Sequence, residues 1–185
     1  VVLEPATHVC PSTSKSKKDC CGKVKCDRSF RSSKNNYLIQ VQKLCKKHGI
    51  VFILDEMITG FRWHMKGAQY LYGVDPDLST FGKAMANGFS VSCVAGKRRI
   101  MELGSIEKPG QERTFLLTTT HGAEMCGLGA FVETVKFMKD NFVIEHMWKY
   151  GYALKKLMNS LADEFDLGKN IIVEGPSCSP IYTIR

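Results

Sequence analysis

The chain has 185 residues, of which 44% are hydrophobic and 24% charged, and it carries a formal net charge of +8. This is the composition of an ordinary soluble globular protein, and no apolar run approaches the roughly 18 residues of a membrane span. The first residues, V-V-L-E-P-A, have neither an initiator Met nor the pattern of a signal peptide, so we expect a strand inside a longer protein.

The chain opens on a predicted strand, Val1–Glu4. Residues 7–34 follow, rich in Ser, Lys and Cys and without periodicity, and they predict a basic, Cys-rich loop insertion. Eight lysines and arginines lie between residues 15 and 34 against two aspartates, so this segment carries most of the net charge. Its one aromatic residue is Phe30, whereas a nucleic-acid-binding strip interleaves several aromatics. A solvated loop is therefore favoured, and no nucleic-acid partner is expected.

Four of the eight cysteines fall within the first 26 residues. Cys20, Cys21 and Cys26 lack the paired CxxC spacing of a structural zinc site, so no metal site is expected. Nothing in the sequence indicates secretion. Reduced thiols and a cytoplasmic location are therefore expected.

Apolar residues at helical spacing predict a helix from Asn35 to His48, with Asn35 or Asn36 as the N-cap and Gly49 at its end. A strand, Ile50–Leu54, follows directly. Its unbroken apolar run is typical of a strand buried on both faces in a parallel sheet. A strand, a helix and a second strand in this order indicate an α/β fold.

The rest of the chain continues with further strands and helices. Strands are expected at residues 78–81, 91–95 and 171–173, a loop at 104–113, and helices ending near 139 and running from 143 to 165. In the last helix an apolar stripe predicts the buried face: Val143, Met147, Tyr150, Leu154, Leu157 and Leu161.

The apolar strand after the first helix ends in two carboxylates, Asp55 and Glu56, which need a partner beside such a core. One candidate is Mg²⁺, which P-loop ATPases hold in this way. That interpretation requires G-x-x-x-x-G-K-[ST], and none of the four Gly-Lys pairs of the chain fits this pattern. A P-loop ATPase fragment whose loop lies upstream stays open as an alternative.

A second candidate cation is the protonated ring nitrogen of pyridoxal 5'-phosphate (PLP), an electron sink that a carboxylate keeps protonated. This cofactor also needs a lysine and donors for its phosphate. Lys83, in F-G-K-A-M-A-N-G-F, has small neighbours that admit a bulky ring, and burial would lower the pKa of its amine and favour the nucleophile. The stretch T-T-T-H-G-A-E before a helix offers hydroxyl and N–H groups to a phosphate.

The three motifs I-L-D-E-M-I-T-G-F-R-W-H, D-L-S-T-F-G-K-A-M-A-N-G-F-S-V and T-T-T-H-G-A-E, in this order, resemble those of the class III PLP-dependent aminotransferases. The resemblance is greatest to the glutamate-1-semialdehyde 2,1-aminomutase branch. It covers nearly all of residues 1–6 and 35–185.

This resemblance implies an α/β fragment of a fold type I PLP-dependent transferase. Residues 1–139 would be the C-terminal part of the PLP-binding large domain, a mixed sheet with flanking helices. Residues 140–185 would be a linking helix and the start of the small domain. The family's N-terminal half has no counterpart in this sequence, so a truncated, inactive relative is a further alternative.

The resemblance also implies roles for single residues. Asp55 would pair with the pyridine nitrogen, Met57 would pack on one ring face, and Lys83 would form the Schiff base and move the proton between substrate Cα and cofactor C4′. Thr119, or Thr120 if the register differs by one, would reach the phosphate of the neighbouring subunit's cofactor in a homodimer. The substrate would be a small amino or keto acid or an amino aldehyde, for an aminotransferase or an aminomutase.

Simpler interpretations stand beside these roles. Asp55 could cap the following turn or pair with Arg62. Glu56 and Arg62 could pair structurally, and no catalytic step is assigned to either of them.

Overall fold

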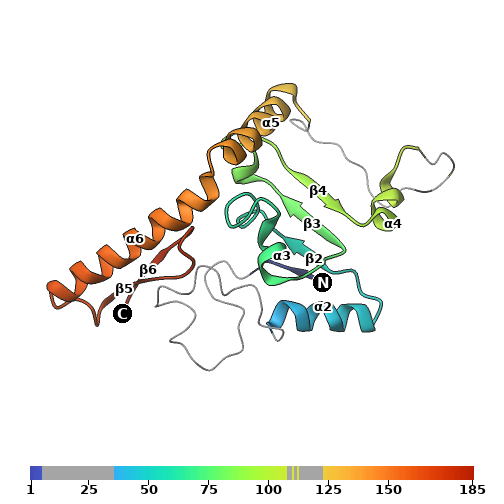
Figure 1. The fold of residues 1–185 in the computed structure, drawn as a ribbon. Coiled ribbons are helices and arrows are strands. Elements are labelled where there is room, and N and C mark those ends of the chain that lie inside the picture. The colour runs from blue at the N-terminus through green and yellow to red at the C-terminus, as the bar shows by residue number, and fades with distance from the viewer. Residues whose placement is uncertain (6–35, 108–109, 111, 113–122) are drawn as a thin grey trace.

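The computed structural model describes residues 1–5, 36–107, 110, 112 and 123–185. The predicted loop at 7–34 and the candidate phosphate ligands Thr119 and Thr120 lie outside these residues. A four-stranded sheet with the order β1-β2-β3-β4 forms the centre of the larger part of the molecule (Figure 1). Its strands are β1 (Val2–Leu3), β2 (Ile53–Asp55), β3 (Leu78–Phe81) and β4 (Cys93–Gly96).

Strands β1, β2 and β3 run parallel, and β4 pairs antiparallel with β3, so the sheet is mixed. In the register of β2 and β3, Asp55 lies opposite Thr80. Both strands therefore end at the same edge of the sheet. The carboxyl edge of parallel strands is where α/β proteins bind their ligands.

Helix α2 (Tyr37–Lys47) confirms the first predicted helix. Asn36 is its N-cap, because the Asn36 side chain accepts a hydrogen bond from the Ile39 N–H at 2.9 Å. Gly49, with φ +64°, lets the chain turn away after the helix. Leu38 of this helix packs against the sheet in the main core. That core consists of Leu38, Cys45, Phe52, Leu54, Trp63, Ala68, Tyr72 and Val74.

The predicted strand Ile50–Leu54 begins three residues too early, and its predicted burial is wrong for the first two residues. Ile50 and Val51 are 42% and 39% exposed, whereas Phe52 and Leu54 are 1% and 0% exposed. The strand begins only at Ile53. The two preceding residues lie beside the start of β1, where the Val51 carbonyl accepts a hydrogen bond from the Val1 amine.

Four short helical segments also lie among the described residues of this part, and the sequence did not predict them. They are α3 (Gly67–Tyr72), η2 (Lys83–Met85), α4 (Arg98–Met101) and η3 (Glu102–Gly104). Each is six residues or fewer, too short for an apolar period to be visible.

Two long helices lead to the second sheet. Helix α5 spans Met125–Asp140 and α6 spans Val143–Glu164; strands β5 (Ile171–Glu174) and β6 (Ile181–Ile184) pair antiparallel and lie beside α6 (Figure 1). The helix bounds and β5 agree with the sequence, but β6 was not predicted.

The predicted buried stripe of α6 is wrong. Tyr150 and Leu157 are 64% and 59% exposed, and the buried residues of α6 are Ile144, Gly151 and Ala162. Gly151 of α6 faces the loop before β6. A Cβ at this position would overlap the Ser177 carbonyl. At Gly151, therefore, the close approach of two backbones and not a large side chain accounts for the buried face of the helix.

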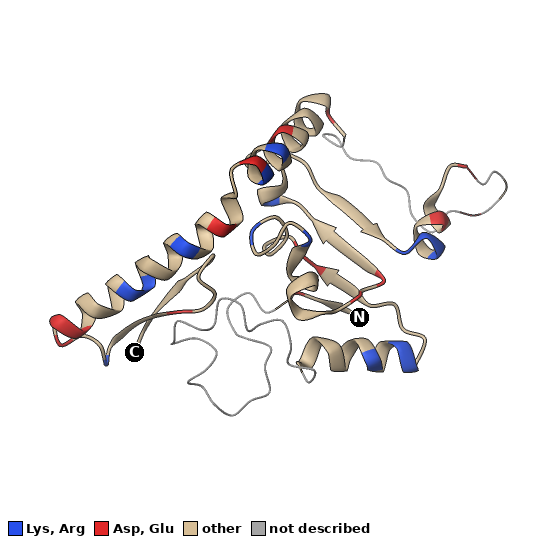
Figure 2. Ribbon diagram, viewed as in Figure 1, with Lys and Arg blue, Asp and Glu red and all other residues tan. Residues whose placement is uncertain are grey.

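Charged residues lie mainly on the helices and at the ends of strands, while the bodies of the strands are uncharged (Figure 2). Within the described ranges, no helix is both long and apolar enough to cross a membrane.

Candidate functional site

Asp55 is the last residue of β2 and is half-buried. Its Oδ1 accepts two hydrogen bonds, from the Met57 N–H at 3.0 Å and from Thr80 Oγ1 at 2.8 Å. Asp55 therefore caps the following turn, as one of the simpler interpretations had it. No donor from the described part of the chain contacts Oδ2 of Asp55, and this oxygen remains available to a further partner.

Met57 reaches across to the segment that follows β3. A Cβ on Gly82 would lie 2.5 Å from the Met57 Cε and 2.9 Å from its Sδ. The thioether therefore rests against the bare backbone of Gly82, the residue before Lys83. In this way the end of β2 and the end of β3 bring Asp55, Met57 and Lys83 to one edge of the sheet.

Lys83 opens the 3₁₀ helix η2 with φ +45°, in the left-handed region that side chains disfavour. Asn87 follows with φ +46° and Gly88 with φ +114°, so unusual backbone conformations cluster around the lysine. Such clusters are frequent at functional sites. The Lys83 carbonyl accepts the Asn87 N–H at 3.1 Å and fixes this turn.

The expected burial of Lys83 is not found, because its side chain is exposed. Among the described residues, none forms a hydrogen bond or ion pair with that amine.

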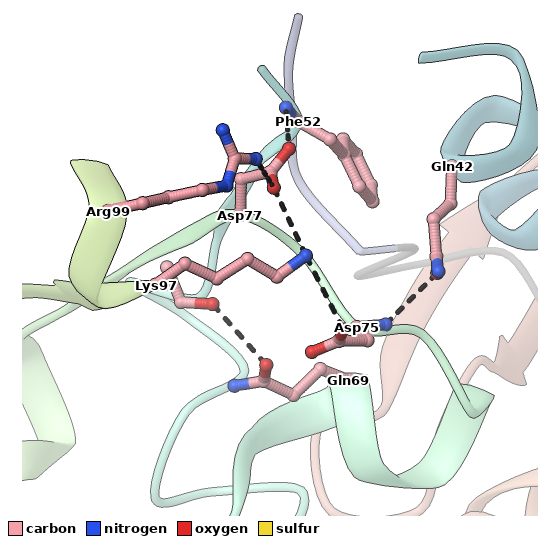
Figure 3. Close-up of polar contacts among 8 residues, drawn as sticks. Gln42, Phe52, Gln69, Asp75, Asp77, Lys97 and Arg99 are labelled. Atoms are coloured by element: carbon pink, nitrogen blue, oxygen red, sulfur yellow. Dashed lines mark hydrogen bonds and ion pairs between the residues drawn. The ribbon is translucent and has the colours of Figure 1, made fainter. Parts of the chain in front are cut away.

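Lys97 shows the opposite situation at the other end of β3 (Figure 3). Its ammonium lies 3.1 Å from Oδ1 of Asp77 and 3.4 Å from Oδ2 of Asp75. The hydrogen bond to Asp77 is the main cause that raises the pKa of Lys97. This lysine is held as a cation in a structural ion pair and is poorly suited to nucleophilic attack.

The partner of Lys97, Asp77, ties three segments together (Figure 3). Its Oδ2 accepts the Phe52 N–H at 3.0 Å, and its Oδ1 accepts Arg99 Nη2 at 2.7 Å. Burial alone would raise the pKa of Asp77, but these hydrogen bonds and the two cations lower it below its ordinary value. The cluster is structural and fixes the amino end of β3.

The suggested pairing of Glu56 with Arg62 is wrong. The Glu56 side chain is 0% exposed, and it accepts hydrogen bonds from Thr59 Oγ1 at 2.5 Å and from the N–H groups of Ala68 and Gln69 at 2.7 Å each. Burial is the main cause that raises the pKa of Glu56. Both oxygens are occupied by donors, which argues against a Mg²⁺ site shared by Asp55 and Glu56.

A cavity of about 460 Å³ lies beside the turn that follows Lys83. Ala84 and Asn87 line it together with Phe61 and Arg62, and α5 and α6 close the other side. None of Asp55, Met57 and Lys83 lines this cavity.

Known proteins are similar to this chain in sequence and in fold. The profile of the family Aminotransferase class-III matches residues 24–179. Glutamate-1-semialdehyde 2,1-aminomutase of Archaeoglobus fulgidus is 37% identical over 132 residues, which are 69% of this chain and 29% of that protein. The protein of the same name from Chlorobium limicola is 44% identical over 96 residues, 50% of this chain and 22% of that one.

Among solved structures, the Sphingopyxis sp. MTA144 FumI protein in its PLP internal aldimine form superposes with a TM-score of 0.69. The identity is 22%, and the match covers 80% of this chain and 33% of that one. The chain therefore spans a third or less of the length of these relatives. The shared fold confirms the prediction of an α/β part of a fold type I transferase, and the sequence matches confirm the resemblance to the aminomutase branch. The chain belongs to the class III aminotransferase family.

Proposed function

We propose that this protein takes part in PLP-dependent transfer of an amino group. The observation that carries the proposal is the meeting of Asp55, Met57 and Lys83 at the carboxyl edge of β2 and β3. The family membership supports the same cofactor. Because the chain spans only part of its relatives, the activity belongs to the full-length protein in this proposal.

The residues present fit this cofactor. Oδ2 of Asp55 would hold the proton on the pyridine nitrogen, while Oδ1 stays bonded to Met57 and Thr80. The Met57 thioether, which rests on Gly82, would offer an apolar surface to one ring face. When bound, the cofactor supplies the electron sink for a carbanion at the substrate Cα.

Lys83 would attach the cofactor through its amine and, once the substrate amine has taken its place, would move the proton between the substrate Cα and C4′ of the cofactor. Two features support this choice of lysine. No carboxylate of the described residues holds the Lys83 amine, whereas two aspartates hold Lys97. Lys83 also follows directly on Gly82, against which Met57 lies.

The remaining assignments are proposals by family resemblance. Thr119 or Thr120 would contact the phosphate of the neighbouring subunit's cofactor in a homodimer, in the cytoplasm. Residues 1–139 would belong to the large domain and 140–185 to the start of the small one. The substrate would be a small amino or keto acid or an amino aldehyde, since the matched relatives are named glutamate-1-semialdehyde 2,1-aminomutase.

The test is the turnover of the full-length protein with Lys83→Ala. We expect a loss of several orders of magnitude, because the change removes both the covalent attachment and the acid–base group. Lys66→Ala is the matched control: Lys66 is an exposed lysine stacked over Tyr70, and its removal should leave turnover unchanged. Transamination retained by Lys83→Ala would refute the proposal, and no turnover in either the wild type or the control would indicate the inactive relative.

A further inference from the structure

We propose that Glu56 is a positioning residue: its buried carboxylate locks the turn that presents Asp55 and Met57 to the cofactor. This inference rests on the proposed function, because it takes Asp55 and Met57 as the groups that contact the ring. It assigns Glu56 a part in the site without any contact to substrate or cofactor.

The two neighbouring carboxylates point to different places. Along β2 and the next residue, exposure alternates: Leu54 and Glu56 are 0% exposed, and Asp55 between them is half-buried. Alternation of this kind puts successive side chains on opposite faces of a strand. The Glu56 carboxylate therefore lies on the core side, and Asp55 stands on the other side.

On the core side, Glu56 binds two separate segments. Thr59 Oγ1, in the same turn, donates to Oε2, and so does the Ala68 N–H, which belongs to the first turn of α3. The Gln69 N–H donates to Oε1. One side chain thus connects the turn after β2 to a helix twelve and thirteen residues later.

The backbone of Glu56 is fixed as well. Its N–H donates to the Thr80 carbonyl at 3.0 Å, and its own carbonyl accepts the Gly60 N–H at 2.8 Å. Main chain and side chain together hold this residue to β3, to its own turn and to α3. Because Asp55 and Met57 flank Glu56 directly, the position of their backbones depends on this anchor.

The fit around the carboxylate is tight. Gly67 has φ +74°, and a Cβ at this position would lie 2.5 Å from Oε1 of Glu56. A buried charge is costly unless donors surround it, and here three donors do. A glutamine would keep the shape but turn an NH₂ group toward an N–H donor, so only the carboxylate satisfies all three partners.

The experiment measures PLP affinity, by quenching of tryptophan fluorescence, in the full-length protein with Glu56→Gln. We expect affinity to fall roughly tenfold, the effect of losing a hydrogen bond to a charged group. Amide hydrogen exchange at Gly60, Ala68 and Gln69 should accelerate in the same variant, with or without PLP. Thr59→Val is a milder second variant that removes one donor, and Thr59→Ser should restore the wild-type affinity.

Two further variants distinguish a general loss of stability, a failure of the proposed role of Glu56 and a failure of the proposed function. Val173→Ala removes a buried side chain from β5 of the second sheet, a strand that carries none of these residues, and controls for lost stability; its PLP affinity should stay within about twofold of the wild type. Asp55→Asn tests the proposed function itself and should weaken PLP binding. If Glu56→Gln and Thr59→Val bind PLP like the wild type while Asp55→Asn does not, Glu56 has no positioning role. If Asp55→Asn also binds normally, the proposed function fails.

Discussion

Thr80 Oγ1 donates a 2.8 Å hydrogen bond to Asp55 Oδ1, across the parallel pair of β2 and β3. The bond joins the two strands at their carboxyl ends, where the candidate site residues lie. It also occupies Oδ1 of Asp55, whereas Oδ2 has no hydrogen-bond partner among the described residues, as the proposed function requires.

Removing this hydroxyl should weaken the site. We expect Thr80→Val to reduce PLP affinity roughly fivefold, since a hydrogen bond to a carboxylate contributes about 1 kcal/mol or more. Thr80→Ser keeps the hydroxyl and should bind PLP like the wild type. Fluorescence titration measures both, and equal affinities for valine and serine variants would contradict this role of Thr80.

We expect that a glycine is required at position 82 because it has no Cβ, and not because of its backbone conformation. Its φ of −176° is extended and open to any residue, but the added carbon would meet the Met57 Cε at 2.5 Å. Gly82→Ala should therefore displace Met57 and lower PLP affinity. In the Met57→Ala background the same change should cost little more, because the obstacle is gone. Fully additive losses in the double variant would show that the contact does not matter.

The packing of α6 on the segment between β5 and β6 gives a prediction about stability. Gly151→Ala would place a Cβ against the Ser177 carbonyl. Because the backbone at Ser177 would have to shift to make room, we expect a loss of about 2–3 kcal/mol in the free energy of unfolding. Gly129→Ala in α5 meets no atom within 4 Å and should gain up to about 1 kcal/mol from helix propensity. Urea denaturation of both variants measures the difference, and a neutral Gly151→Ala would contradict the described packing.

The Asp77 cluster predicts a pH dependence. Because the pKa of Asp77 is lower in the folded protein, its contribution is present above the ordinary pKa and is lost as pH falls through the folded value. Asp77→Asn should cost about 1 kcal/mol at pH 7, a modest amount since Lys97 and Arg99 are 39% and 66% exposed. The difference in unfolding free energy between wild type and variant should begin to shrink below about pH 4 and should vanish as the pH falls through the folded value. A difference in unfolding free energy that grows as the pH falls would contradict a lowered pKa of Asp77.

Local signals allowed much of the fold to be predicted. Asn36 as N-cap, Gly49 as the helix end and the apolar run of β3 each act within a few residues, and the structure confirms them. The exposed stripe of α6 could not be anticipated. Its apolar side chains have the right period, but the choice of buried face depends on the close approach of Ser177 to Gly151, far along the chain.

In the candidate site, too, some residues could be predicted from local motifs and others could not. Asp55, Met57 and Lys83 were named from motifs, and the structure brings them to one edge of the sheet. Two of the three partners of Glu56 gave no signal in the sequence, because they are backbone N–H groups of a short helix that follows the left-handed turn at Gly67. The only local sign was Thr59, three residues after Glu56.

The most direct test of the account is chemical. The full-length protein is incubated with PLP, reduced with borohydride and digested, and the modified peptide is identified by mass spectrometry. We expect the pyridoxyl group on Lys83, whose amine has no partner among the described residues. An adduct on Lys66 or Lys97, or a folded protein with no adduct, would contradict the central claim that Lys83 and Asp55 form the cofactor site.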